Sequence, residues 1–288
     1  MAIGTNIRTY FNGTWHNEDL AVMKAADHGS WLGTTVFDGA RFFEGVHPDL
    51  EAHCARTNRS AEALMITPTV TTEQMIEIVK EGLALFPKDA AVYIRPMYWA
   101  IDGGHMGVAP QENSTGFAIS LEQIAMAPAQ ASSRLTTTRF RRPTLDSAVV
   151  NAKAGCLYPN NARMLMEARA KGFDNALSLD ALGNVAETAT ANIFMVKDGE
   201  IFTPIANGCF LAGITRARHI NNLRADGYTV HETVLGTDDF HNADEVFASG
   251  NMSKVTPVSA FEDTQYNVGP VTQRVRELYW DWALSGKD

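Results

Sequence analysis

Residues 125–134, which read AMAPAQASSR, interrupt the sequence near its middle. The stretch is small, polar and proline-containing and has no helical or strand period, which is typical of a linker between domains. The chain has 288 residues, which is long for a single compact core. We therefore expect a small N-terminal α+β domain over residues 1–124, a linker over 125–134 and a larger cofactor-binding domain over 135–288.

Each half mixes short strands with amphipathic helices, which predicts a mixed α+β fold. Asn12-Gly13 predicts a type I′ hairpin between strands Ile7–Phe11 and Thr14–His16. Thr71 with Gln74 predicts a capping box at the start of a helix. Further helices are expected from about residue 48 to 64, 160 to 171, 213 to 226 and 270 to 284. Further strands are expected over 34–43, 90–99, 116–124, 176–180, 191–197, 201–203, 228–235 and 244–248.

Charge and composition exclude several classes of protein. The net charge of −9 argues against a nucleic-acid partner and against docking on anionic lipid. No run of about 18 apolar residues occurs, and the N-terminus has no signal-peptide core, so we expect a cytoplasmic protein. The cysteines are three and widely separated, and the histidines are dispersed, so we expect neither a disulfide framework nor a metal site. Glycine-rich nucleotide motifs are also absent.

Lys153 is the only charged residue between Ser147 and Ala162, in the sequence SAVVNAKAGCLYPNNA. Burial of a lysine among small apolar residues lowers its pKa and makes the neutral amine accessible. A neutral amine is what Schiff-base chemistry with an aldehyde or ketone requires. The alternative is a lysine that reaches solvent from a strand edge.

Downstream residues favour the chemical interpretation. Glu187 is the only acid between Asp180 and Asp198, and a carboxylate there would keep the ring nitrogen of an aromatic cofactor protonated. The segment LAGITR (211–216) is a loop-to-helix junction whose free amides, at Gly213, Ile214 and Thr215, can hold a phosphate. Each signal alone has a structural alternative: Glu187 as a solvent-facing strand residue, and the glycine as an ordinary helix start. Together they match pyridoxal 5′-phosphate (PLP).

The ordered series of motifs resembles the class IV aminotransferases, which are PLP enzymes of fold type IV, and among them the branched-chain amino acid aminotransferases. The motifs that carry the resemblance are GTTVFDGARFF (33–43), His53-x-x-Arg56, YIRPM (93–97), MGVAP (106–110), NAKAG (151–155), ETATANIF (187–194), LAGITR (211–216) and DEVFASG (244–250). The resemblance implies a two-domain fold like that of D-amino acid aminotransferase. It also implies a homodimer with shared active sites between the domains.

The same resemblance assigns roles to individual residues. Lys153 would be the catalytic lysine that forms the aldimine with PLP. The residues implied to bind the cofactor are Arg56, Ile214, Thr215 and Gly213 at its phosphate, Asn251 as a further phosphate donor, Tyr158 at O3′ and Glu187 at N1. The residues implied to contact substrate are Phe37, Gly39, Tyr93 and Arg95, with Met106 and Val108 of the 105–110 loop entering the neighbouring subunit's site. The implied reaction moves an amino group between Leu, Ile or Val and 2-oxoglutarate by a ping-pong mechanism.

Three departures from the branched-chain pattern bear on the substrate. Leu32 stands where a tyrosine is usual, and residues 125–134 lack the Trp- or Tyr-bearing loop that covers an apolar side chain. Asn251-Met252 replaces a Thr-Ala turn, and Met252 adds bulk at the substrate mouth. The alternatives are an (R)-amine or D-amino acid transaminase, aminodeoxychorismate lyase on the same fold, and a non-catalytic binding protein.

Overall fold

The computed structural model describes residues 4–286, which form two compact units. The first contains the chain up to Met126 together with Asn151–Cys156, and the second contains Ala127–Val150 and the chain from Leu157 on. The expected boundaries had placed residues 151–156 wholly in the second domain. Residues 151–156 group with the first unit because Ala154 forms an isolated antiparallel β-bridge with Val36. In addition, the Phe37 N–H donates to the Lys153 carbonyl oxygen at 3.1 Å.

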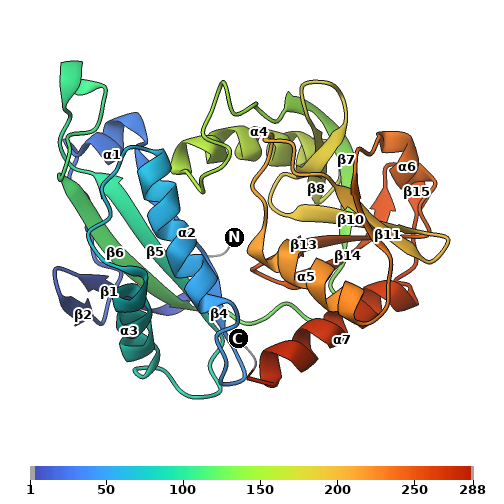
Figure 1. Cartoon of the computed structure of the whole chain (residues 1–288), viewed down its shortest axis with the longest axis horizontal. Coiled ribbons are helices and arrows are strands. Elements are labelled where there is room, and N and C mark those ends of the chain that lie inside the picture. Colours follow the sequence, from blue (N-terminus) through green and yellow to red (C-terminus); the bar gives the residue numbers. More distant parts are fainter. Residues whose placement is uncertain (1–3, 287–288) are drawn as a thin grey trace. The chain divides into compact units, whose positions relative to one another are not determined.

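The first unit is built on a six-stranded sheet in the order β2-β1-β6-β5-β3, with β4 also paired to β5 (Figure 1). Its strands are β1 (Thr5–Phe11), β2 (Thr14–His16), β3 (Thr35–Phe37), β4 (Ala40–Phe42), β5 (Val92–Ala100) and β6 (Thr115–Gln123). Its helices are α1 (His28–Leu32), α2 (Leu50–Ala63), α3 (Thr72–Leu83) and the 3₁₀ turn His105–Gly107.

The two faces of this sheet carry different side chains. The Tyr98 hydroxyl donates to Asn58 Oδ1 on α2 at 3.1 Å, so the even positions of β5 face the helices. Because successive strand residues point to opposite faces, Tyr93 and Arg95 lie on the other face of the sheet. The two β5 residues expected to contact substrate, Tyr93 and Arg95, therefore lie on the face of the sheet opposite the helices.

Two local predictions in this unit are confirmed. Strands β1 and β2 pair antiparallel, and Asn12 (φ 50°) and Gly13 (φ 82°) both adopt the positive φ of a type I′ turn. At the start of α3, the Thr71 hydroxyl accepts from the Gln74 N–H, and the Gln74 side chain accepts from the Thr71 N–H. The helix begins where the capping box predicts.

The second unit is built on a nine-stranded sheet in the order β12-β11-β10-β13-β14-β7-β8-β9, with β15 also paired to β14 (Figure 1). Its strands are β7 (Ser133–Arg141), β8 (Asn175–Leu179), β9 (Val185–Thr188), β10 (Asn192–Lys197), β11 (Glu200–Pro204), β12 (Val230–Thr233), β13 (Glu245–Gly250), β14 (Lys254–Phe261) and β15 (Thr264–Gln265). Its helices are α4 (Tyr158–Ala170), α5 (Ile214–Ala225), α6 (Thr237–His241), α7 (Pro270–Leu284) and the 3₁₀ turn Gly155–Leu157, whose first two residues belong to the first unit.

Strand β10 separates two cores in this unit. Ile193 and Met195 pack into one apolar cluster with β8 and β14, while Phe194 and Val196 pack into another beneath α5 and α7. This alternation explains why β10 reads as continuously apolar, since both of its faces are covered.

Strands β7, β9, β14 and β15 and the short helices α1 and α6 were not predicted from the sequence. Strand β9 contains Glu187 and Thr188 and shows no apolar alternation, yet all four of its residues are buried. Strand β14 begins with a lysine and contains Pro257, both of which are unfavourable strand signals. The last two residues of the expected linker belong to β7. Within residues 4–286, no helix combines the length and the apolar character needed to cross a bilayer.

Candidate active site

The main chain around Lys153 is held in place by its neighbours in the first unit. Its N–H donates to Ser60 Oγ on α2, and its carbonyl oxygen accepts from the Phe37 N–H, each at 3.1 Å. The half-buried side chain places Nζ 5.2 Å from the centre of the Phe37 ring. At that distance an aromatic face attracts an ammonium group. The amine at position 153 is thus presented from a fixed backbone against an aromatic wall.

Gly39 and Tyr93 continue this wall. A Cβ atom at Gly39 would lie 2.1 Å from the Tyr93 hydroxyl, so only glycine lets the tyrosine ring approach this closely. The Arg95 guanidinium lies 5.1 Å from the centre of the Tyr93 ring. The first unit therefore groups Lys153 with Phe37, and Gly39 with Tyr93 and Arg95.

Arg95 already has an acidic partner, Glu122 on the neighbouring strand β6. Arg95 Nη1 donates to Glu122 Oε1, and the buried carboxylate also accepts from the Gly4 N–H at 3.1 Å and from Ser120 Oγ at 3.3 Å. These side chains line a hollow of about 240 Å³. Glu122 was not predicted as a site residue, although an acid within the buried strand GFAISLEQI was a signal for it.

Arg56 is held by a buried carboxylate, Asp38, which was likewise not predicted as a site residue. Asp38 Oδ2 accepts from Arg56 Nε at 2.6 Å, and Oδ1 accepts from Arg56 Nη2 at 2.8 Å and contacts His53 Nδ1 at 2.7 Å. Burial alone raises the pKa of Asp38, but the charges and hydrogen bonds of Arg56 and His53 outweigh it and hold this pKa well below its usual value. Asp38 thus fixes the guanidinium that the resemblance assigns to the cofactor phosphate.

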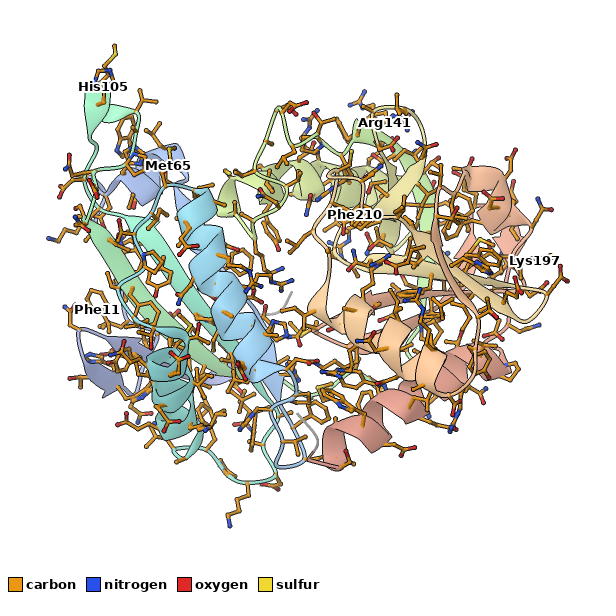
Figure 2. The ribbon with its side chains drawn as sticks, in the orientation of Figure 1. Phe11, Met65, His105, Arg141, Lys197 and Phe210 are labelled. Carbon is orange, nitrogen blue, oxygen red and sulfur yellow. The ribbon has the colours of Figure 1, made fainter. Side chains whose placement is uncertain are left out.

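Three further predicted residues of this unit lie at its surface. The exposed fractions of Leu32, Met106 and Val108 are 40%, 84% and 71%. The loop that carries His105 extends away from the end of its own sheet (Figure 2). His28, which is buried, anchors the base of this loop, because its Nε2 lies 3.0 Å from the Val108 carbonyl oxygen.

In the second unit, Glu187 is a buried residue with charged and polar partners. Its Oε1 lies 2.7 Å from Arg142 Nη2, and its Oε2 accepts from Asn192 Nδ2 at 3.2 Å. Arg142 is also buried and donates to Asn161 Oδ1 at 2.6 Å. The alternative of a solvent-facing strand residue is therefore wrong. Arg142 and Asn192 were not predicted, because nothing local in the sequence links them to Glu187.

The same asparagine reaches the start of α5. Asn192 Nδ2 also donates to the Leu211 carbonyl oxygen at 3.2 Å, and its Oδ1 lies 2.1 Å from where a Cβ of Gly213 would be. Gly213 is the N-cap of α5 and, as a glycine, has no side chain that could cap the helix. Thr215, in the first turn, is buried. Ile214, the first residue of α5, is half-buried. Asn192 thus connects the Glu187 carboxylate to an uncapped helix N-terminus.

Two buried donors lie at the end of β13. Ser249 pairs in register with Asn192 across the sheet, and Asn251 follows directly after the strand. Ser249 Oγ and Asn251 Nδ2 are buried and have no hydrogen-bond partner within residues 4–286. Buried donors without acceptors cost free energy, and an anion bound at the start of α5 would satisfy them. Met252, the next residue, is half-buried.

Tyr158 completes the set of predicted residues. It is the first residue of α4 and is half-buried. The predicted residues of the second unit are therefore Tyr158, Glu187, the 213–215 turn, Asn251 and Met252, and those of the first unit are Lys153, Arg56 and the substrate residues.

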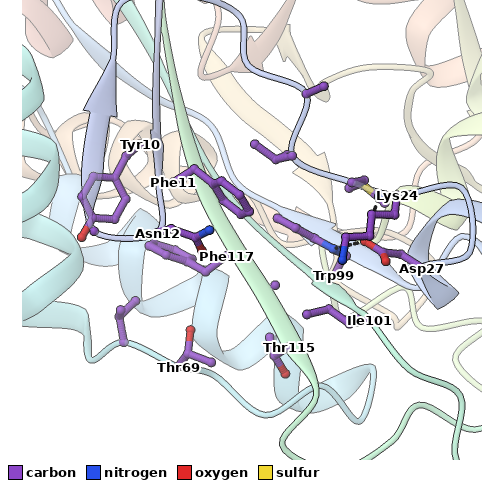
Figure 3. A pocket seen from close by; sticks show the side chains of 16 residues that line it. Tyr10, Phe11, Asn12, Lys24, Asp27, Thr69, Trp99, Ile101, Thr115 and Phe117 are labelled. Atoms are coloured by element: carbon purple, nitrogen blue, oxygen red, sulfur yellow. Dashed lines mark hydrogen bonds between the residues drawn. The ribbon is translucent and has the colours of Figure 1, made fainter.

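A larger hollow in the first unit, of about 580 Å³, contains none of the predicted site residues. It lies beside the β1–β2 turn, and Figure 3 shows Phe11, Trp99 and Thr115 on its walls. Trp99 Nε1 donates to Asp27 Oδ2 at 3.0 Å across one end. Its lining is largely aromatic and aliphatic, and we assign it no chemistry.

The family to which these features point is shown by sequence. The sequence model of the family described as "Amino-transferase class IV" matches residues 35–261. The chain therefore belongs to this family. It is similar to a putative branched-chain-amino-acid aminotransferase of Methanocaldococcus jannaschii, with 33% identity over 98% of this chain and 100% of that protein. It is also similar to the branched-chain-amino-acid aminotransferase of Salmonella typhimurium, with 30% identity over 94% of this chain and 91% of that protein.

Solved structures agree with this relationship. An aminotransferase from Brucella abortus, bound to the cofactor PLP, has 55% identity and a TM-score of 0.95 over 96% of this chain and 99% of its own. The branched-chain amino acid aminotransferase of Escherichia coli has 29% identity and a TM-score of 0.89 over 96% of this chain and 94% of its own. The predictions of a PLP-dependent class IV aminotransferase resembling the branched-chain enzymes, and of its mixed α+β fold type IV architecture, are confirmed.

Proposed function

We propose that this PLP-dependent aminotransferase moves an amino group between the branched-chain L-amino acids Leu, Ile and Val and 2-oxoglutarate. Family membership, the names of the relatives and the PLP in the Brucella abortus neighbour support this function. The observation that carries it is the position of Asn192, whose side chain contacts both the Glu187 carboxylate and the turn at the start of α5.

The residues of the second unit fit PLP. The cofactor needs a carboxylate at its ring nitrogen and several donors at its phosphate. Glu187, ion-paired to Arg142, is the carboxylate for N1, and the start of α5 with Thr215, Ser249 and Asn251 offers the donors. We further assign Tyr158 to O3′ and Arg56, held by Asp38, to the phosphate. When bound, PLP supplies an electron sink for the substrate carbanion.

Lys153 is the residue to which we assign covalent attachment and proton transfer. Its Nζ would take the proton from the substrate Cα and would deliver it to C4′ of the bound cofactor. The hydrogen bonds to Ser60 and Phe37 fix the main chain of Lys153. Only its side chain therefore has to move between the atom that gives the proton and the atom that receives it. A base that is already held in place is more effective, because little further rotational entropy is lost on reaching the transition state.

Substrate selection is assigned to the aromatic wall and Arg95. Phe37, Gly39 and Tyr93 present an apolar surface suited to a branched aliphatic side chain. Arg95 uses Nη1 for Glu122, and its remaining N–H donors suit a substrate carboxylate. Met106, Val108 and Met252 are assigned to the substrate mouth, the first two from the second subunit of a homodimer. The homodimer and a cytoplasmic location stay predictions.

An amino-donor panel tests the function. Mixing the PLP-loaded enzyme with L-leucine, D-alanine or (R)-1-phenylethylamine, without acceptor, should convert the bound cofactor to its amine form fastest with L-leucine. Conversion only by D-alanine or the (R)-amine would replace this function by the alternative transaminases. Pyruvate release from aminodeoxychorismate without any acceptor would identify the lyase.

Variants add a matched control to the panel. Lys153→Ala should abolish multiple turnover, whereas Lys88→Ala, on an exposed surface turn, should leave it unchanged. Full turnover by Lys153→Ala would contradict the assignment of Lys153.

A further inference from the structure

Lys254 is a buried lysine beside the proposed phosphate site. It is 1% exposed, begins β14 and pairs in register with Gly250 at the end of β13. Its Nζ donates to Asn251 Oδ1 and lies 5.2 Å from the centre of the Tyr279 ring. Its φ of 66° is uncommon for a residue with a side chain. Because lysine is almost never fully buried unless it is paired, this position is a candidate for a functional role.

The chemistry of the contact fixes the orientation of the Asn251 amide. An ammonium group only donates hydrogen bonds, so it must face the amide oxygen. The amide nitrogen, with its two N–H donors, is then turned away from Lys254. This nitrogen is buried and finds no acceptor among the residues from 4 to 286, and the same holds for Ser249 Oγ on the adjoining strand end. The contact with Lys254 therefore leaves the Asn251 amide N–H groups available to donate to a bound anion.

We propose that Lys254 is a positioning residue for the phosphate of the cofactor. It holds Asn251 with its N–H groups toward the anion, and its positive charge lies behind the amide. Asn251 then acts as a polarised donor, which binds an anion more strongly than an isolated amide does. The inference rests on the proposed PLP site, and it adds a residue that neither the resemblance nor the motifs identified.

Comparison of PLP with pyridoxal, which lacks the phosphate, tests this role. Both ligands are titrated into the apo-protein, and binding is followed by the quenching of tryptophan fluorescence. In Lys254→Met the Kd for PLP should rise about 10- to 100-fold, the range expected when a hydrogen bond to a charged group is lost. The Kd for pyridoxal should change less than about threefold. Lys88→Met, which removes the same charge from an exposed turn, should change neither.

A second variant tests the same contact independently, in case Lys254→Met does not fold. Asn251→Asp keeps a partner for Lys254 but replaces the donor with a carboxylate, so it should weaken PLP selectively and at least as strongly. An unchanged Kd for PLP in both variants, or an equal loss for PLP and pyridoxal, would overturn the role of Lys254 while leaving the proposed function intact. Wild-type protein that binds PLP no better than pyridoxal would overturn the phosphate site itself, and this inference with it.

Discussion

Replacing Asp38 by Asn should strongly destabilise the first unit. The carboxylate accepts from two nitrogens of Arg56, from the Gly39 N–H and from His53, and it is fully buried. The asparagine amide would offer one acceptor oxygen and would point its own N–H groups at the guanidinium. Arg56, only 9% exposed, would lose the carboxylate that balances its charge.

The expected cost follows from this loss of compensation. Breaking a buried ion pair on one side costs about 3–5 kcal/mol, out of a total stability of about 5–15 kcal/mol. This corresponds to a fall in Tm of roughly 10 °C. Glu77→Gln, which breaks the exposed pair with Lys80, should cost less than about 1 kcal/mol and serves as the control.

Thermal and urea unfolding of the apo-protein measures both effects without a contribution from bound cofactor. The double variant Asp38→Asn/Arg56→Met should lose less stability than the two single variants summed, by about 1–3 kcal/mol, because the unpaired charge is gone. Additive losses, or an Asp38→Asn variant as stable as Glu77→Gln, would refute the reasoning.

Three further predictions concern Asp38 in the first unit and Glu187 and Asn192 in the second. Because the pKa of Asp38 is held low in the folded chain, its contribution is complete above its unfolded pKa of about 3.9 and is lost as the pH falls below that value. Between about pH 4 and 2, wild-type stability should fall more steeply than that of Asp38→Asn, by up to about 1.4 kcal/mol per pH unit, and parallel urea-unfolding curves would contradict this. Arg142→Met should cost about 3–5 kcal/mol by leaving Glu187 buried without its cation, and a loss under about 1 kcal/mol would show that the pair is not coupled. Gly213→Ala should weaken PLP binding by about tenfold or more, because the new Cβ displaces Asn192, and an unchanged Kd would place the phosphate elsewhere.

Local sequence signals predicted the parts of the fold that local energetics decide. The hairpin at Asn12-Gly13 and the capping box at Thr71 depend only on residues a few positions apart, and both occur. Strand β9 was missed because its burial comes from neighbouring strands and not from its own pattern. The positive φ of Lys254 follows from the return of β14 along β13, which no local motif records.

The candidate site shows the same division. Lys153 and Glu187 were selected because a lone charge among apolar residues is visible in the sequence. The partners that hold Glu187 and Arg56 were not predicted, since Arg142 and Asp38 reach these two residues only through tertiary structure. Arg95 was expected as a carboxylate ligand, and the pairing of β5 with β6 gives it a protein partner, Glu122, as well.

Borohydride reduction of the PLP-loaded enzyme, followed by proteolysis and mass spectrometry, identifies the lysine that carries the cofactor. We expect a single phosphopyridoxyl group, on the peptide that contains Lys153. A label on Lys254 or any other lysine, or a fully active enzyme with no label, would contradict the assignment on which the proposed function depends.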